Sequence, residues 1–165
     1  MPIIHCQVKA IASTPDGKQI QVPPAQALAV RGPVVQVLVS VPAQVAERLT
    51  KESKPIPSPV PGLGLIDTGA TGSCVDEEVA KKLQLPIVNV VSMASAAHAA
   101  TDRNVYPLTF DILGFGATGK ITVNSPRVTG AELGVQGLIL LIGRDLLANT
   151  CLIYNGIAGA FTLSI

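Results

Sequence analysis

The apolar run Gly62-Leu63-Gly64-Leu65-Ile66 ends in Asp67, and this carboxylate is the group in the chain best placed to do chemistry. Asp is depleted from strands and is seldom buried without a partner, so an Asp delivered by an apolar strand points to a functional purpose. Two carboxylates that share one site can divide the work of hydrolysis. One stays protonated and polarises a carbonyl, while the other takes a proton from water. The segment around Asp67 therefore predicts one half of such a site.

A second half is missing from the same chain. The other aspartates are Asp16, Asp76, Asp102, Asp111 and Asp145. None of them lies in a second Asp-Thr/Ser-Gly sequence. A symmetric dimer would bring Asp67 of each subunit together on the two-fold axis, because an isologous interface places every residue opposite its own copy. Dimerisation would then be a chemical requirement.

A later motif, Leu140-Leu141-Ile142-Gly143-Arg144-Asp145-Leu146-Leu147, lies about 75 residues after Asp67. Together with Asp67-Thr68-Gly69-Ala70 it resembles the retropepsin-like aspartic proteases, the single-lobe family that includes the retroviral enzymes. That family has an apolar-apolar-Gly strand followed by an Arg-Asp or Arg-Asn helix start at this place. The closing segment Phe161-Thr162-Leu163-Ser164-Ile165 also resembles the C-terminal strand that holds the family's dimer together. The resemblance covers roughly residues 30 to 165.

The resemblance implies an all-β fold, a retropepsin-like closed or rolled β-sheet domain over residues 29–165 with one or two short helices, acting as a symmetric homodimer. Residues 1–28 would form an N-terminal arm or hairpin. The implied activity is that of an aspartic endopeptidase, a hydrolase that cleaves peptide bonds in extended polypeptides with a water activated by two Asp67 carboxylates. The polypeptide substrate would lie as an added strand, with apolar pockets taking alternate side chains.

The neighbours of Asp67 suit this role. Gly69 lets the backbone come close to the paired carboxylates and supply N–H donors to them. The resemblance implies that Thr68 hydrogen-bonds across the dimer interface, and Ala70 leaves room for substrate. The alternative is a glycine-containing turn that follows a strand by chance.

The residues of the later motif are predicted to be structural. Gly143 would let two chain segments pass closely, and Arg144 would anchor the helix by a fork-like ion pair. Retroviral relatives often place an acid four residues after the active Asp to meet this arginine, whereas that position here is Thr71, so either another acid serves Arg144 or the arginine works differently. Asp145 can cap the helix over residues 146–149.

A candidate flap lies between two predicted strands, Ile87–Met93 and Val105–Ile112. By position, the connecting segment matches the hairpin that closes over substrate in the family. The candidate flap residues are Ala94, Ser95, Ala96, Ala97 and His98. The family usually has glycine at the flap tip and this segment has none, so a helical turn or a plain loop stays open as an alternative. His98 is expected to be a solvated loop residue and not a catalytic base.

A function of a different class also stays open, namely a non-catalytic dimeric β module that keeps the protease-like fold to bind peptide or to assemble. The flap without glycine and the missing acid at Thr71 favour it. An aspartyl-phosphate enzyme is disfavoured, because the usual second Asp two residues after the first is replaced by Gly69.

Composition excludes several other classes. The 165 residues fit one domain with a sizeable core, since 48% are hydrophobic and only 14% are charged. A formal net charge of +1 provides no basic face for nucleic acid. No secretion signal or membrane-spanning run is apparent, so we expect no membrane partner and a cytoplasmic location. The widely spaced cysteines suggest no metal and no cofactor, and we expect Cys74 and Cys151 to be buried thiols.

Local patterns predict the elements around the site. Val34–Val41 has the β-branched composition of a strand, and Pro42 opens a helix with Val45 and Leu49 on one face. Asn155-Gly156 predicts a tight hairpin near the end of the chain.

A further helix is predicted after the Asp67 loop. Ser73-Cys74-Val75-Asp76 has the pattern of a capping box. The helix it predicts would carry Val75, Val79 and Leu83 along one side.

Overall fold

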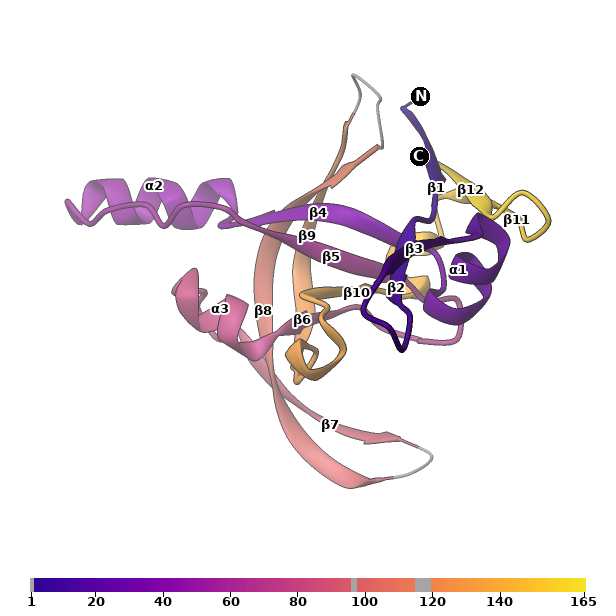
Figure 1. Cartoon of the computed structure of the whole chain (residues 1–165). Coiled ribbons are helices and arrows are strands. Elements are labelled where there is room, and N and C mark those ends of the chain that lie inside the picture. Colours follow the sequence, from indigo (N-terminus) through magenta and orange to yellow (C-terminus); the bar gives the residue numbers. More distant parts are fainter. Residues whose placement is uncertain (1, 96–97, 115–119) are drawn as a thin grey trace.

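The computed structural model describes residues 2–95, 98–114 and 120–165, and most of its ordered elements are strands (Figure 1). The strands are β1 (Ile3–Gln7), β2 (Ala10–Ser13), β3 (Gln19–Val22), β4 (Val34–Ser40), β5 (Val60–Ile66), β6 (Cys74–Asp76), β7 (Asn89–Ser95), β8 (His98–Leu113), β9 (Lys120–Ala131), β10 (Leu140–Ile142), β11 (Cys151–Asn155) and β12 (Ala160–Ser164). The helices are α1 (Pro24–Arg31), α2 (Ala43–Lys51), α3 (Glu77–Lys82) and α4 (Arg144–Leu147), with a 3-10 turn η1 over Gly134–Gln136.

Within the described residues, six strands close into a barrel in the order β4, β5, β10, β6, β9 and β8, and β8 pairs again with β4. Closure leaves these six strands without a free edge. A seventh strand, β7, pairs with β8 and, within the described residues, has no strand on its other side. The predicted all-β class with a closed sheet and short helices is confirmed. The described residues hold four α-helices, against the one or two that the resemblance implies.

The barrel interior is built from aliphatic side chains that alternate along the strands. On β4, Val35, Val37 and Val39 are at most 1% exposed, while Gln36 between them is exposed. Such alternation is what a strand with one buried face requires, and each buried valine contributes about 1.5–3 kcal/mol of transfer free energy. Phe110 of β8 is fully buried in the same core. The strand predicted over residues 34–41 is confirmed, and so is the helix after Pro42, which is α2.

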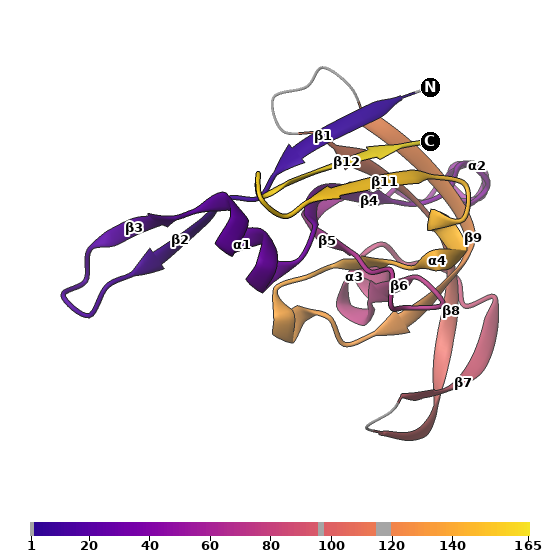
Figure 2. The same cartoon turned by 90° about the vertical axis from the view of Figure 1, so that its right-hand side faces the viewer.

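A separate three-stranded sheet joins the two ends of the chain. β1 pairs antiparallel with β12, and β12 pairs antiparallel with β11. Figure 2 shows these strands running together, with the β2–β3 hairpin extending away from the body beside α1. The hairpin predicted near Asn155-Gly156 is therefore present as β11–β12, with a longer turn over residues 156–159. A role of residues 1–28 toward a partner stays a prediction.

The helix predicted from the capping box starts later than expected. Residues 74–76 form β6, which pairs with β10 and β9, and α3 begins only at Glu77. Asp76 is the cap, because its side chain accepts a hydrogen bond from the Glu78 N–H at 3.1 Å. The same carboxylate accepts from the backbone N–H groups of Leu133 and Gly134 at 2.9 and 2.8 Å. These long-range pairings override the local capping pattern at Ser73.

The candidate flap is a hairpin with longer strands than predicted. β7 ends at Ser95 and β8 begins at His98, so residues 98–104 continue β8 and are not part of a loop. Ala96 and Ala97 lie outside the described residues. The ladder between β8 and β9 shifts register between Tyr106 and Leu108, where Pro107 lies opposite Pro126 and Arg127 of β9; a proline has no N–H to donate to a ladder.

Further along the β8–β9 ladder, Asp111 accepts hydrogen bonds from Lys120 at 2.8 Å and from Thr122 at 2.6 Å. Burial acts against ionisation of this carboxyl. The two hydrogen bonds and the charge of Lys120 outweigh it, so the pKa of Asp111 lies below its ordinary value.

The cysteines are less buried than expected. Cys151 is exposed on β11, and Cys74 is only partly buried on β6, so the prediction of two buried thiols is wrong. β11 is the outer strand of its sheet and most of its residues face outward. Burial raises the pKa of the Cys74 thiol, and the Asp145 carboxylate acts in the same direction.

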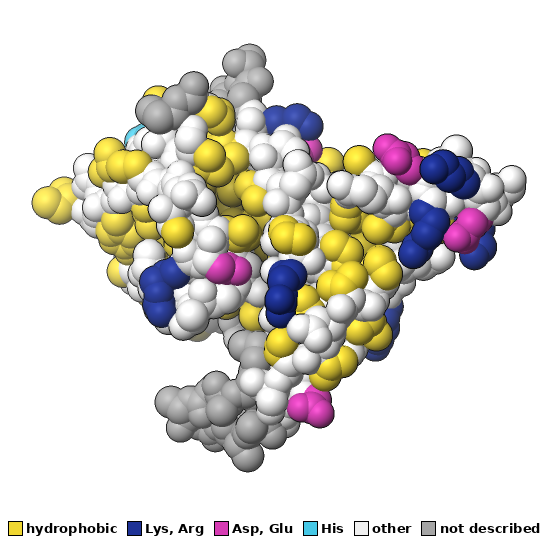
Figure 3. All heavy atoms as spheres, turned by 180° about the vertical axis from the view of Figure 1, so that it is seen from behind, with side chains coloured by type: hydrophobic (Ala, Val, Ile, Leu, Met, Phe, Trp, Pro, Cys, Tyr) yellow, Lys and Arg dark blue, Asp and Glu magenta, His cyan; other side chains and the backbone are white. Residues whose placement is uncertain are grey.

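The outer surface carries charges of both signs. Figure 3 shows Lys, Arg, Asp and Glu side chains interspersed at the end of the molecule that holds α2. There Glu52 lies 2.7 Å from the Lys54 ammonium and 3.9 Å from Arg48. No helix in the described part of the chain is long and apolar enough to cross a membrane.

Candidate active site

Asp67 directly follows the last residue of β5, at the point where the parallel strands β5 and β10 end side by side. Ile66, the last residue of β5, pairs with Ile142 of β10, and both are 2% exposed. The Asp67 N–H donates to the Ile142 carbonyl at 2.9 Å, so the backbone is fixed up to this residue. The Asp67 residue is only partly buried, which leaves its carboxylate accessible at the end of a rigid pair of strands.

The carboxylate of Asp67 is oriented by its own loop. Its Oδ1 accepts hydrogen bonds from the N–H groups of Gly69 at 2.8 Å and Ala70 at 3.2 Å. A Cβ at Gly69 would lie 3.1 Å from the same oxygen, closer than side chains ordinarily pack. Within the described residues, Oδ2 accepts no hydrogen bond. One oxygen is therefore fixed and the other is available for a substrate, a water or a second carboxyl group. Thr68 itself is exposed beside this carboxylate.

The later motif packs directly against the loop that follows Asp67. A Cβ at Gly143 would lie 2.6 Å from the backbone carbonyl of Gly72, so only glycine fits there. Ser73, which is 1% exposed, accepts a hydrogen bond from the Gly143 N–H at 2.9 Å. Its hydroxyl donates to Asp145 Oδ1 at 2.7 Å, and its N–H donates to Asp145 Oδ2 at 3.1 Å.

These contacts correct the interpretation of Asp145. Helix α4 begins at Arg144, so Asp145 lies in its first turn and does not precede it as a cap. Both of its carboxylate oxygens accept hydrogen bonds from Ser73, and Oδ1 also accepts one from the Leu146 N–H at 2.9 Å within α4. Ser73 is the site residue that the sequence did not reveal, because its capping-box pattern offered a local explanation.

The expected ion pair of Arg144 is replaced by bonds to the backbone. Its Nη1 donates to the carbonyls of Thr68 at 2.7 Å and Gly69 at 2.9 Å, and its Nη2 donates to the Thr71 hydroxyl at 3.0 Å. Thr71, the position where the resemblance led us to look for an acid, thus still serves this arginine through its hydroxyl. Of the two alternatives, the second therefore holds: within the described residues no carboxylate lies within 4 Å of the guanidinium, and Arg144 works through hydrogen bonds to the loop in place of an ion pair.

A groove of about 430 Å³ lies beside Asp67. Its walls come from the connection between α1 and β4, from the end of β5 with the residues that follow it, and from β11. The lining residues are Gly32, Pro33, Leu65, Ile66, Asp67, Thr68, Leu152 and Tyr154. The Tyr154 hydroxyl donates to the Leu28 carbonyl at 3.4 Å, which ties this wall to α1. The groove is mostly apolar, with one carboxylate at its edge, and Tyr154 was not indicated by the sequence.

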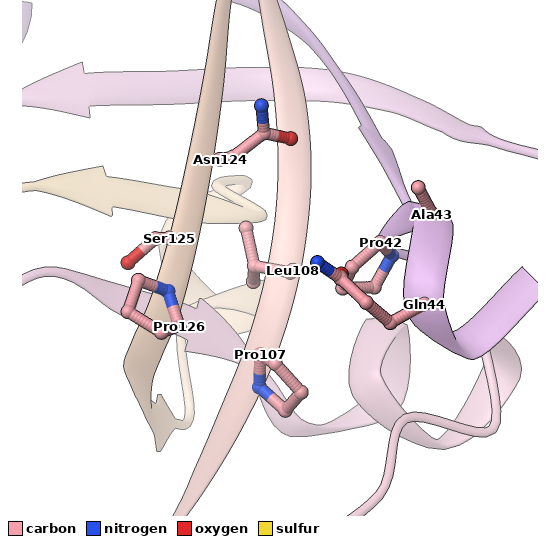
Figure 4. A pocket seen from close by; sticks show the side chains of 8 residues that line it. All are labelled: Pro42, Ala43, Gln44, Pro107, Leu108, Asn124, Ser125 and Pro126. Carbon is pink, nitrogen blue, oxygen red and sulfur yellow. The ribbon is translucent and has the colours of Figure 1, made fainter.

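A second hollow of about 430 Å³ lies elsewhere on the barrel, between the start of α2 and the strands β8 and β9 (Figure 4). It is lined by Pro42, Ala43, Gln44, Pro107, Leu108, Asn124, Ser125 and Pro126. None of these residues carries an ionisable side chain, and none lines the groove at Asp67. This hollow therefore has no group that could activate a water.

The candidate flap extends from the barrel as the β7–β8 hairpin, at the bottom of Figures 1 and 2. Ala94 and Ser95 end β7, and His98 begins β8, with Ser95 paired to His98. Closure of this hairpin over Asp67 stays a prediction.

No protein-family model matches the chain, and no curated protein matches its sequence. Among solved structures, the chain is similar to a retropepsin-like aspartic protease from Rickettsia conorii, known from a crystal structure. The two share 13% sequence identity with a TM-score of 0.40, over 99% of this chain and 94% of that chain.

Proposed function

We propose that the protein is an aspartic endopeptidase that works as a homodimer, with one Asp67 from each subunit in a shared site. The observation that supports this most is the state of the Asp67 carboxylate. Two backbone N–H groups hold Oδ1, while Oδ2 is open beside an apolar groove. A single carboxylate cannot both donate and accept a proton in one step, so the reaction needs a second one.

In the proposed reaction the Asp67 of one subunit is ionised and the Asp67 of the other is protonated, because two carboxyl groups so close together do not both carry a negative charge. The ionised carboxylate takes a proton from water as the water oxygen bonds to the peptide carbonyl carbon. The protonated carboxyl group gives its proton to the carbonyl oxygen, which produces a neutral tetrahedral diol. The carboxyl group that is now protonated gives its proton to the amide nitrogen, while the other carboxylate takes a proton from one hydroxyl of the diol. The C–N bond then breaks, which releases an amine and a carboxylic acid and restores one ionised and one protonated Asp67.

The substrate in this proposal is an extended polypeptide. A groove with apolar walls beside the reacting carboxylate suits an apolar side chain next to the cleaved bond. β7 is an outer strand with a free side, so it offers backbone groups to a peptide that adds as a further strand.

The test is hydrolysis of a mixed peptide library, read by mass spectrometry, with Asp67→Asn against Asp16→Asn. Asp16 lies at the exposed tip of the β2–β3 hairpin, so its replacement should leave cleavage unchanged. Asp67→Asn should abolish cleavage while the protein stays folded. Full peptidase activity of Asp67→Asn in a clean preparation would refute the proposal.

The dimer is tested separately by mixing wild-type and Asp67→Asn subunits in equal amounts under exchange conditions. If both carboxylates are needed, only pairs of wild-type subunits cleave. These make up one quarter of the dimers, so activity should fall to about one quarter of that of wild-type enzyme at the same total protein concentration. A fall to about one half would mean that each subunit works alone.

A further inference from the structure

Two successive peptide groups connect Arg144 to Asp67. The first joins Thr68 to Gly69, and the second joins Gly69 to Ala70. Their carbonyl oxygens accept hydrogen bonds from Arg144 Nη1 at 2.7 and 2.9 Å. Their N–H groups donate to Asp67 Oδ1 at 2.8 and 3.2 Å. The same two peptide groups thus bind a cation at one end and a carboxylate at the other.

This arrangement has an electrostatic consequence. A peptide group is conjugated, so a cation on its oxygen draws electron density from its nitrogen and makes the N–H a stronger donor. Successive hydrogen bonds polarise one another, by about 10–30% per bond. Because both N–H groups meet the same oxygen, the two effects add at Asp67 Oδ1.

Within the described residues, the Arg144 guanidinium makes its hydrogen bonds to the loop that follows Asp67. Its third contact, from Nη2 to the Thr71 hydroxyl at 3.0 Å, also lies on the Asp67 loop. No salt bridge of Arg144 is found in the part of the chain that the structure describes. Backbone bonds from the Arg144 N–H to Ala70 and from the Asp145 N–H to Thr71, at 3.0 and 3.2 Å, hold the start of α4 against the same segment.

We propose that Arg144 is a positioning residue for Asp67, acting through the Thr68–Gly69 and Gly69–Ala70 peptide groups to strengthen the N–H donors that orient the carboxylate. Its effect on rate rests on the proposed function. The polarised peptide groups themselves do not, because they are present in each chain whether or not it cleaves peptides.

The direct test is the amide ¹H chemical shift of Gly69 and Ala70 in ¹⁵N-labelled protein. Arg144→Met should move both resonances upfield, as weaker hydrogen bonds do. Arg144→Lys should give an intermediate shift, because lysine keeps the charge but lacks the planar fork. Thr71→Val is the matched control, since it removes one Arg144 contact but leaves the two carbonyl bonds, and it should shift neither resonance appreciably.

Amides of the barrel core, such as Val37, report whether each variant is folded. If Arg144→Met does not fold, the comparison of Arg144→Lys with Thr71→Val decides the matter. Shifts of Gly69 and Ala70 in Arg144→Lys no larger than those in Thr71→Val would overturn the inference.

Kinetics provide a second readout if the protein cleaves peptides. Arg144→Met should lower kcat by up to about 10²-fold, the loss typical of a slightly misplaced reacting group, with little change in KM. Arg144→Lys should recover part of that loss. A change confined to KM would contradict a role in orienting Asp67. Absence of cleavage by the wild type would refute the proposed function and leave the amide shifts to decide this inference.

Discussion

The Ser73 hydroxyl hydrogen-bonds to Gly143 and Asp145, which joins two parts of the chain that are far apart in sequence. Among the groups at the site, its removal should lower the free energy of unfolding most. In Ser73→Ala, the buried Gly143 N–H loses its acceptor, which costs about 1–3 kcal/mol. The hydrogen bond to Asp145 is also lost, but this carboxylate is exposed and rehydrates, so that loss is only about 0.5–1.5 kcal/mol. Together the free energy of unfolding should fall by roughly 1.5–4.5 kcal/mol.

Ser125→Ala is the matched control. Ser125 is also buried, but its hydroxyl makes one long bond, 3.3 Å to the Arg127 carbonyl. Its replacement should cost at most about 1 kcal/mol. Urea unfolding followed by circular dichroism measures both variants, and the slope with urea must be unchanged for the comparison to hold. If Ser73→Ala loses no more stability than Ser125→Ala, the Gly143 N–H and Asp145 do not depend on this hydroxyl.

Three further predictions concern packing and ionisation. Gly143→Ala forces a methyl group against the Gly72 carbonyl and should destabilise the protein by about 1–3 kcal/mol in urea unfolding; wild-type stability would contradict the close contact. At about pH 8, iodoacetamide should label exposed Cys151 well before Cys74, whose thiol has a raised pKa, and peptide mass spectrometry should find unequal rates. The lowered pKa of Asp111 gives stability that is present above its unfolded-state pKa, about 3.9, and lost as pH falls through the lower folded-state value. Asp111→Asn should therefore lose less stability than the wild type between about pH 7 and pH 3, and equal losses would refute this.

Sequence patterns were sufficient to predict those strands and helices whose formation depends on residues close together in the chain. The apolar run before Asp67 predicts a buried strand, and β5 is that strand. The β-branched composition of residues 34–41 and the proline before α2 likewise identified their elements, because strand propensity and proline chemistry act within a few residues.

The contacts around the candidate site could not be predicted in the same way. The bonds from Ser73 to Gly143 and from Arg144 to Thr68 join residues 70 and 76 positions apart. No local pattern encodes such partners. At Ser73 the local pattern even pointed elsewhere, because residues 74–76 gain more from pairing with β9 and β10 than from starting a helix. The catalytic role of Asp67 itself stays a proposal.

The pairing of β1 with β12 has a consequence for how the chain is made. His5 and Thr162, which meet across these strands, are 157 positions apart. During synthesis β1 therefore has no β12 to pair with until almost all of the sequence has been made, and its backbone N–H and C=O groups stay unpaired until then. An unpaired strand of this kind attracts other strands, so nascent chains should need shielding, by a chaperone or by low concentration, before the two ends meet.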